Sequence, residues 1–434
     1  MSGPIPNGRV VIVAANASTT MGGEAILPLH YFRVLKRRGA DVHLVAHERN
    51  RGDLARYFDG DLAGIHLVED TWLHKAIDRV GRRRSSWFMH MLVYNVAYVW
   101  NEVVQRRRVR ELVAQAGAGV VHLPTPVSPR AVSVMSGLGA PTVFGPMNGG
   151  MTYPPGYGSH EGSFGRLAVR LGRGAARVAN LLLPAKRRAA RLVVANARTE
   201  AALPFAAPGR VTQVVENGVQ AEMWRRSSAV VPAPDPDGAF RLVFVGRLVA
   251  FKAVDVTLAA LADARARGLK VSLAVVGSGP EGERLRGIAQ ALGLGDAATF
   301  HAFMPQTEVA GMLAEADAFV FNSLRDCGGA AVLEARASGL PVIASAWGGP
   351  LDYLDEASGI LVHPSPADTF ARRLADAIEA LARDRERARR MGRAGRDRVL
   401  AEFDWERKVD RMVAIYDEAR TPTPASAAAR TVRA

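Results

Sequence analysis

The chain has 434 residues, 48% of them hydrophobic, so it is long enough for two domains with sizeable cores. A single cysteine excludes an internal disulfide and a cysteine-based metal site, and it fits a reducing compartment. The positive charge is uneven, because residues 1–210 hold 28 of the 56 Lys and Arg residues but only 13 of the 42 acidic ones. Such a half attracts nucleic acid, anionic membrane or phosphorylated substrates, and the lack of a zinc-finger or RNA-binding signature makes nucleic acid the least favoured of these.

Strand and helix patterns alternate from the start of the chain. The run RVVIVAA (9–15) predicts a buried strand rather than a signal peptide, and a helix up to Arg38 follows it. Gly39 ends that helix, and DVHLVAH (41–47) predicts the next strand. Further strands are predicted at GVVHLP (119–124), PTVFGP (141–146) and RLVVAN (191–196). The pattern restarts after Pro208, which predicts two domains of parallel sheet with helices on both faces, 1–208 and 209–403. Residues 421–434 lack apolar periodicity and are predicted to be disordered.

Two basic stretches allow two interpretations. Residues 82–110 hold about twenty mostly apolar residues between arginine clusters, near the length that spans a bilayer. Residues 166–196 repeat arginines at roughly helical spacing. Polar residues interrupt the first stretch, so we expect either a helix packed on the core or a helix lying on an anionic membrane.

Glycines follow the predicted strand at 271–276. Gly277, Gly279 and Gly282 form a literal G-x-G-x-x-G, but it lies in the middle of the second predicted domain rather than in its first βα unit. This position favours a bare helix N-terminus facing a nucleotide over a nicotinamide site.

The segment FVGRLVAFK (244–252) places Arg247 and Lys252 after a buried strand that ends at Gly246. Two cations at the carboxyl edge of a parallel sheet suit a diphosphate, although two unrelated surface charges remain the alternative for this segment alone.

The segment RDCGGAAVLEA (325–335) supplies the matching groups. Gly328 and Gly329 let backbone N–H groups approach an anion where a helix begins. Glu334, about a turn and a half further on, could accept two hydrogen bonds from a ribose, and Asp326 could accept from a second sugar. The pattern indicates a nucleotide-diphosphate sugar.

The second half resembles the donor-binding domain of the family 4 glycosyltransferases, which are retaining enzymes. The resemblance rests on ENGV (216–219), GRLVAFK (246–252), GSGPEG (277–282), the two carboxylates eight residues apart, GLPV (339–342) and GGPLDYL (348–354), and it is strongest over residues 190–365. It implies an α/β chain of GT-B architecture, with two Rossmann-like, doubly wound parallel-sheet domains facing each other across a cleft. It also implies that residues 404–420 form a closing helix that crosses back to the first domain.

Carried over by position, the resemblance implies a donor site and a set of catalytic residues. Arg247 and Lys252 would clamp the diphosphate, Glu334 would hold the ribose, and Asp326 would hold the transferred sugar. The remaining donor-binding residues would be Gly246, Gly277, Gly279, Gly328, Gly329 and Ala330.

The first domain would bind the acceptor. The acceptor side would comprise Gly22, Gly23, Gly149, Gly150 and His122, and Asn148 would join the catalytic set, although a structural role for His122 is the favoured alternative. Asn148–Gly150 stand where many members carry a histidine, so a histidine base is not expected.

The sequence departs from the family pattern at two further positions. Asp326 stands for the usual glutamate and Ala253 for the usual glycine after the lysine. The pair Asp235 and Asp237 precedes a strand in a Pro-rich loop, so we expect a solvated turn and no metal.

The predicted function is retaining transfer of a sugar from a nucleotide-diphosphate sugar to a glycan, lipid-linked, in bacterial cell-surface or exopolysaccharide biosynthesis. No cofactor or metal is expected. The protein would be cytoplasmic, with peripheral contact between its basic half and the anionic inner face of the cell membrane through Arg82–Arg84, Arg106–Arg108 and Trp87 or Trp100. The alternatives are a soluble small-molecule acceptor, a nucleotide-sugar epimerase or sugar phosphorylase, a dinucleotide oxidoreductase, and a non-catalytic membrane-surface protein.

Overall fold

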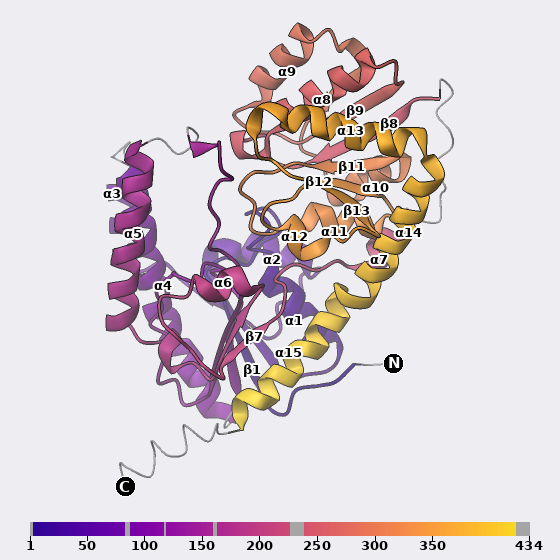
Figure 1. The fold of residues 1–434 in the computed structure, drawn as a ribbon. Helices are drawn as coiled ribbons and strands as arrows, with labels where there is room; N and C mark the ends of the chain where they lie inside the picture. The colour runs from indigo at the N-terminus through magenta and orange to yellow at the C-terminus, as the bar shows by residue number, and fades with distance from the viewer. Residues whose placement is uncertain (1–2, 83–86, 117–118, 159–162, 226–237, 422–434) are drawn as a thin grey trace. The chain divides into compact units, whose positions relative to one another are not determined.

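A computed structural model describes residues 3–82, 87–116, 119–158, 163–225 and 238–421. The chain divides into two compact units, shown as a ribbon in Figure 1. Unit 1 comprises residues 1–150, 167–216 and 405–434, and unit 2 comprises residues 151–166 and 217–404. The pair Asp235 and Asp237, Arg83 and Arg84, and the predicted tail after Thr421 lie outside the described residues.

Unit 1 is built on a seven-stranded sheet in the order β3-β2-β1-β4-β5-β6-β7, and every pairing is parallel. The strands are β1 (Val10–Val13), β2 (Val42–His47), β3 (Ile65–Val68), β4 (Val120–Leu123), β5 (Thr142–Met147), β6 (Arg191–Val194) and β7 (Val211–Gln213). All residues of β1 and β4 are buried, as expected for parallel strands that are covered on both faces.

The helices of unit 1 supply two core clusters. They are α1 (Leu27–Arg37), α2 (Arg51–Tyr57), α3 (Trp72–Arg82), α4 (Trp87–Ala116), α5 (Ser163–Leu182, which enters unit 1 at Leu167), α6 (Ala197–Ala201) and α15 (Trp405–Arg420). One cluster joins alternate sheet residues to α1 and α15, and the other joins the remaining sheet residues to α4. The sheet is therefore a middle layer between helices.

Unit 2 is built on a six-stranded parallel sheet in the order β10-β9-β8-β11-β12-β13. The strands are β8 (Phe240–Val245), β9 (Val271–Val276), β10 (Ala298–His301), β11 (Ala318–Phe321), β12 (Val342–Ser345) and β13 (Gly359–Val362). The helices are α7 (Ala221–Arg225), α8 (Val254–Ala266), α9 (Gly282–Ala291), α10 (Gln306–Glu315), α11 (Ala330–Ala337), α12 (Pro350–Tyr353), α13 (Phe370–Arg383) and α14 (Arg385–Glu402).

The prediction of two parallel-sheet α/β units is confirmed, but the boundary between them lies elsewhere than at residue 208. β7 pairs with β6, so unit 1 extends through Glu216. Residues 151–158 belong to unit 2, because Trp347 Nε1 donates to Thr152 O at 2.8 Å and Tyr157 OH donates to Pro364 O at 3.1 Å. Within unit 1, α15 packs on α1.

The described part of α4 packs on the core over its second half. Glu102 and Gln105 are buried, and Gln105 Nε2 donates to Ala14 O at 3.0 Å. Arg106 donates to Ser136 O at 2.6 Å, and the indole of Trp100 donates to Thr71 Oγ1 at 2.9 Å. These contacts attach the second half of α4 to unit 1, and the membrane roles predicted for Trp100 and Arg106 stay predictions. No helix within the described residues is long and apolar enough to cross a membrane.

Candidate functional site

The predicted donor residues lie at the carboxyl edge of the unit 2 sheet, where ligands of open α/β sheets bind. Lys252 follows β8, and Asp326 follows the neighbouring strand β11. The structure brings the two together, since Lys252 Nζ forms an ion pair with Asp326 Oδ2. The same ammonium group lies 4.4 Å from the ring centroid of Phe321, a cation–π distance.

Buried hydrogen bonds fix the loop that carries Lys252. Asn322 Nδ2 donates to Ala253 O at 2.7 Å, and Thr257 Oγ1 donates to Asn322 Oδ1 at 2.8 Å. Ala253 adopts φ +48°, the left-handed conformation that glycine reaches without strain. The residue that departs from the family pattern therefore keeps the backbone shape that a glycine would give.

Gly277 and Gly279 allow the backbone of the loop after β9 to pack closely against the backbone of the loop after β8. A Cβ at Gly277 would lie 2.0 Å from Gly246 O, and a Cβ at Gly279 would lie 2.2 Å from Leu248 O. The loop after β9 can therefore lie against the loop that carries Arg247 only if both positions are glycine. Arg247 is exposed, and its guanidinium makes no hydrogen bond or ion pair with the residues that the structure describes.

The first turn of α11 offers backbone donors. Within the described ranges, the N–H groups of Gly328, Gly329 and Ala330 have no hydrogen-bond acceptor, as is usual where a helix begins. The loop after β12 passes close to this turn, because Gly349 N donates to Asp326 O at 2.8 Å and a Cβ at Gly349 would lie 1.9 Å from Gly328 O. The motif at 348–349 thus shapes the start of α11, a role that the sequence did not reveal.

Glu334 lies in α11 with its carboxyl group partly buried. Burial raises the pKa of Glu334 to about 7, while a hydrogen bond of 2.9 Å from Gln306 Nε2 lowers the pKa by less. Sequence reasoning missed Gln306, the first residue of α10. A polar residue just after the carboxyl end of β10 was the available signal.

Together these groups have the chemistry of an anion and polyol site. A lysine, an exposed arginine and backbone N–H groups can bind phosphate oxygens, and two carboxylates can accept hydrogen bonds from hydroxyls. Figure 1 shows α11 and α12 beside the strands of the unit 2 sheet.

The predicted acceptor residues lie in loops at the carboxyl edge of the unit 1 sheet. Val127 N donates to Glu24 Oε1 at 2.8 Å, and Asn148 N donates to Val127 O at 2.8 Å. These bonds tie the Gly22–Gly23 turn to the Asn148–Gly150 loop. Asn148 is only 3% exposed and accepts from Thr199 Oγ1 at 3.3 Å, so its catalytic role stays a prediction.

His122 does not fit the acceptor side. It is fully buried in β4, where Nε2 contacts Gly145 O at 2.6 Å and Nδ1 contacts the Tyr416 hydroxyl at 2.8 Å. Burial lowers the pKa of His122 to about 4, so the ring is neutral near pH 7. With both nitrogens occupied inside the core, the ring joins β4 to α15.

One cluster of potential metal ligands, His47, Asp70 and His74, occurs in the described part of unit 1. His47 Nδ1 accepts from Arg49 N at 3.1 Å, which leaves the proton on Nε2, where it points to Asp70 Oδ1 at 3.1 Å. His74 Nδ1 lies 3.1 Å from Thr71 N, and that N–H donates to it. Because backbone donors occupy a lone pair on each ring, the cluster fits a hydrogen-bonded corner better than a cation site.

Comparisons with known proteins agree with this geometry. Residues 231–398 match the family model described as glycosyl transferases group 1. A D-inositol 3-phosphate glycosyltransferase of Segniliparus rotundus is 32% identical over 236 residues, which cover 52% of this chain and 51% of the relative. A GDP-mannose-dependent alpha-(1-6)-phosphatidylinositol monomannoside mannosyltransferase of Mycobacterium tuberculosis is 36% identical over 173 residues, 38% of this chain and 44% of the relative. The chain thus spans about half the length of these curated relatives.

Solved structures resemble nearly the whole chain in fold. HepE from Anabaena, crystallised with UDP, has a TM-score of 0.63 at 14% identity and covers 94% of this chain and 98% of its own. Sucrose-phosphate synthase from Thermosynechococcus elongatus has a TM-score of 0.61 at 20% identity, with 95% and 99% covered. The fold of the chain is therefore GT-B. The similarity to the glycosyl transferases group 1 covers residues 231–398.

Proposed function

We propose that this protein is a retaining glycosyltransferase that moves a sugar from a nucleotide-diphosphate sugar to a lipid-linked glycan in bacterial cell-surface or exopolysaccharide biosynthesis. The observation that carries the proposal is the group of residues at the start of α11. Lys252 and Asp326 form an ion pair there, and backbone N–H groups follow that have no acceptor among the described residues. Glu334 lies further along the same helix.

The chemistry follows from these groups. When the bond between the sugar and the diphosphate breaks, negative charge grows on the leaving phosphate and positive charge grows on the sugar ring. Arg247, Lys252 and the dipole of α11 would stabilise the leaving diphosphate, a preorganised electrostatic effect. Asp326 would contact the transferred sugar, and Glu334 would hold the ribose.

Metal independence is part of the proposal. Two cations and a helix N-terminus can neutralise a diphosphate without Mg²⁺ or Mn²⁺. We expect EDTA to leave the transfer rate unchanged. A complete loss that Mn²⁺ restores would contradict this point.

An anionic, membrane-associated acceptor is supported by unit 1. Arg130, Arg173 and Arg177 line a cavity of about 470 Å³, and burial together with the charge of Arg173 lowers the pKa of Arg130. Three neighbouring cations suit a phosphate group. The names of both relatives above include a phosphorylated inositol, in one case joined to a lipid.

The soluble acceptor remains the second candidate, because the name of the Segniliparus relative specifies inositol 3-phosphate. The deciding experiment supplies UDP-, GDP- and ADP-sugars to the purified chain, with inositol 3-phosphate in solution or phosphatidylinositol in vesicles as acceptor. Transfer only to the vesicles supports the lipid-linked acceptor, and transfer only to inositol 3-phosphate supports the soluble one. No transfer, no donor hydrolysis and no thermal stabilisation by any donor would argue against a glycosyltransferase.

A further inference from the structure

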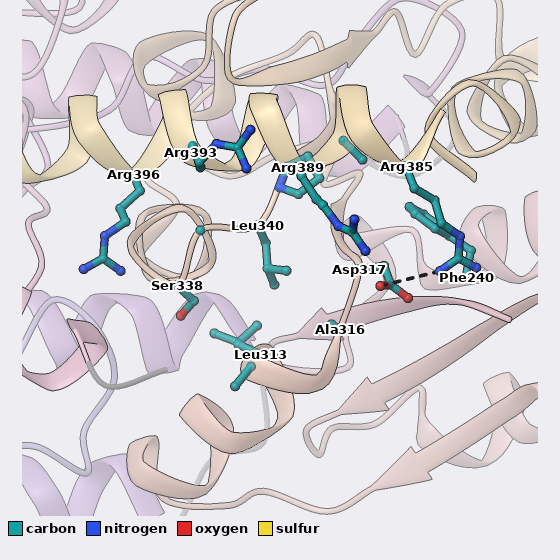
Figure 2. Close-up of a pocket in the computed structure, with 14 residues that line it drawn as sticks. Phe240, Leu313, Ala316, Asp317, Ser338, Leu340, Arg385, Arg389, Arg393 and Arg396 are labelled. Carbon is teal, nitrogen blue, oxygen red and sulfur yellow. Dashed lines mark ion pairs between the residues drawn. The ribbon is translucent and has the colours of Figure 1, made fainter. Parts of the chain in front are cut away.

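A cavity of about 190 Å³ lies at the amino edge of the unit 2 sheet (Figure 2). It opens where β8, β11 and β12 begin, and its lining includes Phe240, Leu313, Leu340 and Pro341. The donor residues follow the carboxyl ends of the same strands. Because β11 has four residues at about 3.3 Å each, roughly 13 Å of sheet separates the two edges. The cavity is therefore distinct from the donor site.

One face of α14 covers this cavity. Arg385, Arg389, Arg393 and Arg396 recur at intervals of four, four and three residues, the spacing of one helix face. Figure 2 shows all four side chains extending from α14, with Arg385 next to Phe240 and Asp317. The helix approaches the sheet closely, since a Cβ at Gly392 would lie 1.9 Å from Gly339 O. This contact fixes the positions from which the arginines extend.

Two of the four arginines already have partners. Arg385 donates to Gly238 O at 2.6 Å and lies 4.0 Å from Asp317, and Arg396 donates to Ala337 O at 2.9 Å. Arg396 thus stabilises the carboxyl end of α11, where a cation is favoured. The acidic group of the cavity, Asp317, also accepts from Arg241 N at 2.8 Å, so its charge is largely compensated.

Arg389 and Arg393 differ from these two. Both are exposed, and neither makes a hydrogen bond or ion pair with any residue in the described ranges. They stand four residues apart on the helix, where like charges repel each other and destabilise the helix. A ligand that accepts hydrogen bonds from both guanidinium groups would reverse this repulsion.

We propose that this cavity is a second ligand site, which binds a small organic phosphate with an apolar body. Arg389 and Arg393 bind the phosphate oxygens, because a guanidinium fork matches phosphate geometry. The apolar body lies against Leu313 and Leu340. A volume of about 190 Å³ accommodates a body the size of a single ring but not a polymer.

The test uses the full chain and phenyl phosphate as the probe. Phenylglyoxal modifies exposed guanidinium groups, and mass spectrometry reads the modification at each arginine. We expect phenyl phosphate to slow the labelling of Arg389 and Arg393 about tenfold, as charge-assisted hydrogen bonds require. Arg387 and Arg390 lie on the same helix but do not line the cavity, so their labelling should not change.

Matched variants complete the design. Arg389→Gln with Arg393→Gln should abolish the rise in melting temperature that phenyl phosphate causes at this site. Arg387→Gln with Arg390→Gln removes the same charge from α14 and should keep that rise. Inorganic phosphate should protect the same two arginines more weakly, because it lacks the apolar body.

Three outcomes would overturn the proposal. Equal protection of Arg389 and Arg393 and of the controls Arg387 and Arg390 would mean only a general ionic effect. No protection of Arg389 and Arg393 would mean that there is no site. Protection by phosphatidylglycerol vesicles but not by phenyl phosphate would identify this face of α14 as a lipid-binding surface instead.

Discussion

Glu334 is the residue whose protonation should be visible in donor binding. Its pKa of about 7 lies above the ordinary value of 4.5, so the free protein holds a mixture of acid and carboxylate near neutral pH. In the proposed donor site, the carboxylate would accept hydrogen bonds from both ribose hydroxyls, whereas the acid would give up one acceptor. We therefore predict that the affinity for a nucleotide sugar increases as the pH rises from 6 to 8. Isothermal titration in buffers of different ionisation enthalpy would also detect the proton released on binding at pH 6.

The variant Glu334→Gln keeps the shape of the side chain and removes its titration. Its donor affinity should not change between pH 6 and 8, and turnover should fall at least about tenfold, since a charge-assisted hydrogen bond contributes about 1.5–3 kcal/mol. The same pKa determines how the stability of the protein changes with pH. Because the pKa of Glu334 is raised from 4.5 to about 7, this residue lowers the stability of the folded state as the pH rises from 4.5 through about 7. Compared with the unchanged protein, Glu334→Gln should therefore gain stability at pH 8 relative to low pH. An unchanged rate would remove Glu334 from the site.

Lys252 and Arg247 should contribute to donor and product alike, because both would bind the diphosphate. Replacing either by Ala should weaken a nucleoside diphosphate about as much as its sugar derivative, by roughly tenfold or more. Lys252→Ala also leaves Asp326 without its partner and should lower the melting temperature. Arg247 is exposed and should not affect it, so Arg247→Ala separates binding from folding. Unchanged diphosphate affinity in both variants would exclude the clamp.

At the residue scale, the sequence could predict the groups that act through their own spacing along the chain. Asp326, the glycines and Glu334 lie within nine residues, so a single turn and helix bring them together. The contacts of Gln306 with Glu334 and of Tyr416 with His122 join residues 28 and 294 positions apart. Such contacts depend on packing between elements, and no local pattern encodes them.

At the element scale, the loop after β9 should determine where Arg247 lies. Gly279→Ala would place a Cβ against Leu248 O, and the clash must move one of the two loops. We predict a loss of stability of about 1–3 kcal/mol and weaker diphosphate binding. Gly287→Ala, within α9 and in open space, is the matched control and should stabilise by roughly 0.5–1 kcal/mol. Equal effects of the two changes would show that the close approach of the loops is unimportant.

The domain boundary shows why a sequence pattern does not reveal to which sheet a strand near a junction belongs. The restart of strand patterns after Pro208 placed β7 in the second domain, yet its partner is β6 of the first sheet. Periodicity identifies a strand but not the sheet that it joins, because register and partner depend on tertiary packing. The same limit applies to α4, whose sequence does not reveal that Glu102 is buried and accepts hydrogen bonds from Ser133 Oγ and Val134 N.

At the scale of the whole molecule, the uneven charge requires an account. The excess of 28 basic over 13 acidic residues lies in residues 1–210. Unit 1 also exposes large apolar side chains, with Trp72 76%, Leu182 75% and Val178 56% exposed. Val178 and Leu182 share α5 with Arg173 and Arg177, and a helix with apolar and basic side chains suits a membrane surface. Each cation near an anionic surface contributes roughly 1 kcal/mol, an effect that salt screens over a Debye length of about 8 Å.

We therefore predict that the protein co-sediments with phosphatidylglycerol vesicles, and that salt and neutral lipid each reduce the bound fraction. Val178→Ser with Leu182→Ser should weaken this binding about tenfold, because two apolar side chains would no longer enter the lipid. Phe303→Ser is the matched control, since Phe303 is 81% exposed but belongs to unit 2. An equal loss in both variants would mean that exposed apolar side chains bind lipid without regard to their place in the fold. Binding that ignores lipid charge and salt, or no binding at all, would leave the basic half unexplained and favour the soluble acceptor.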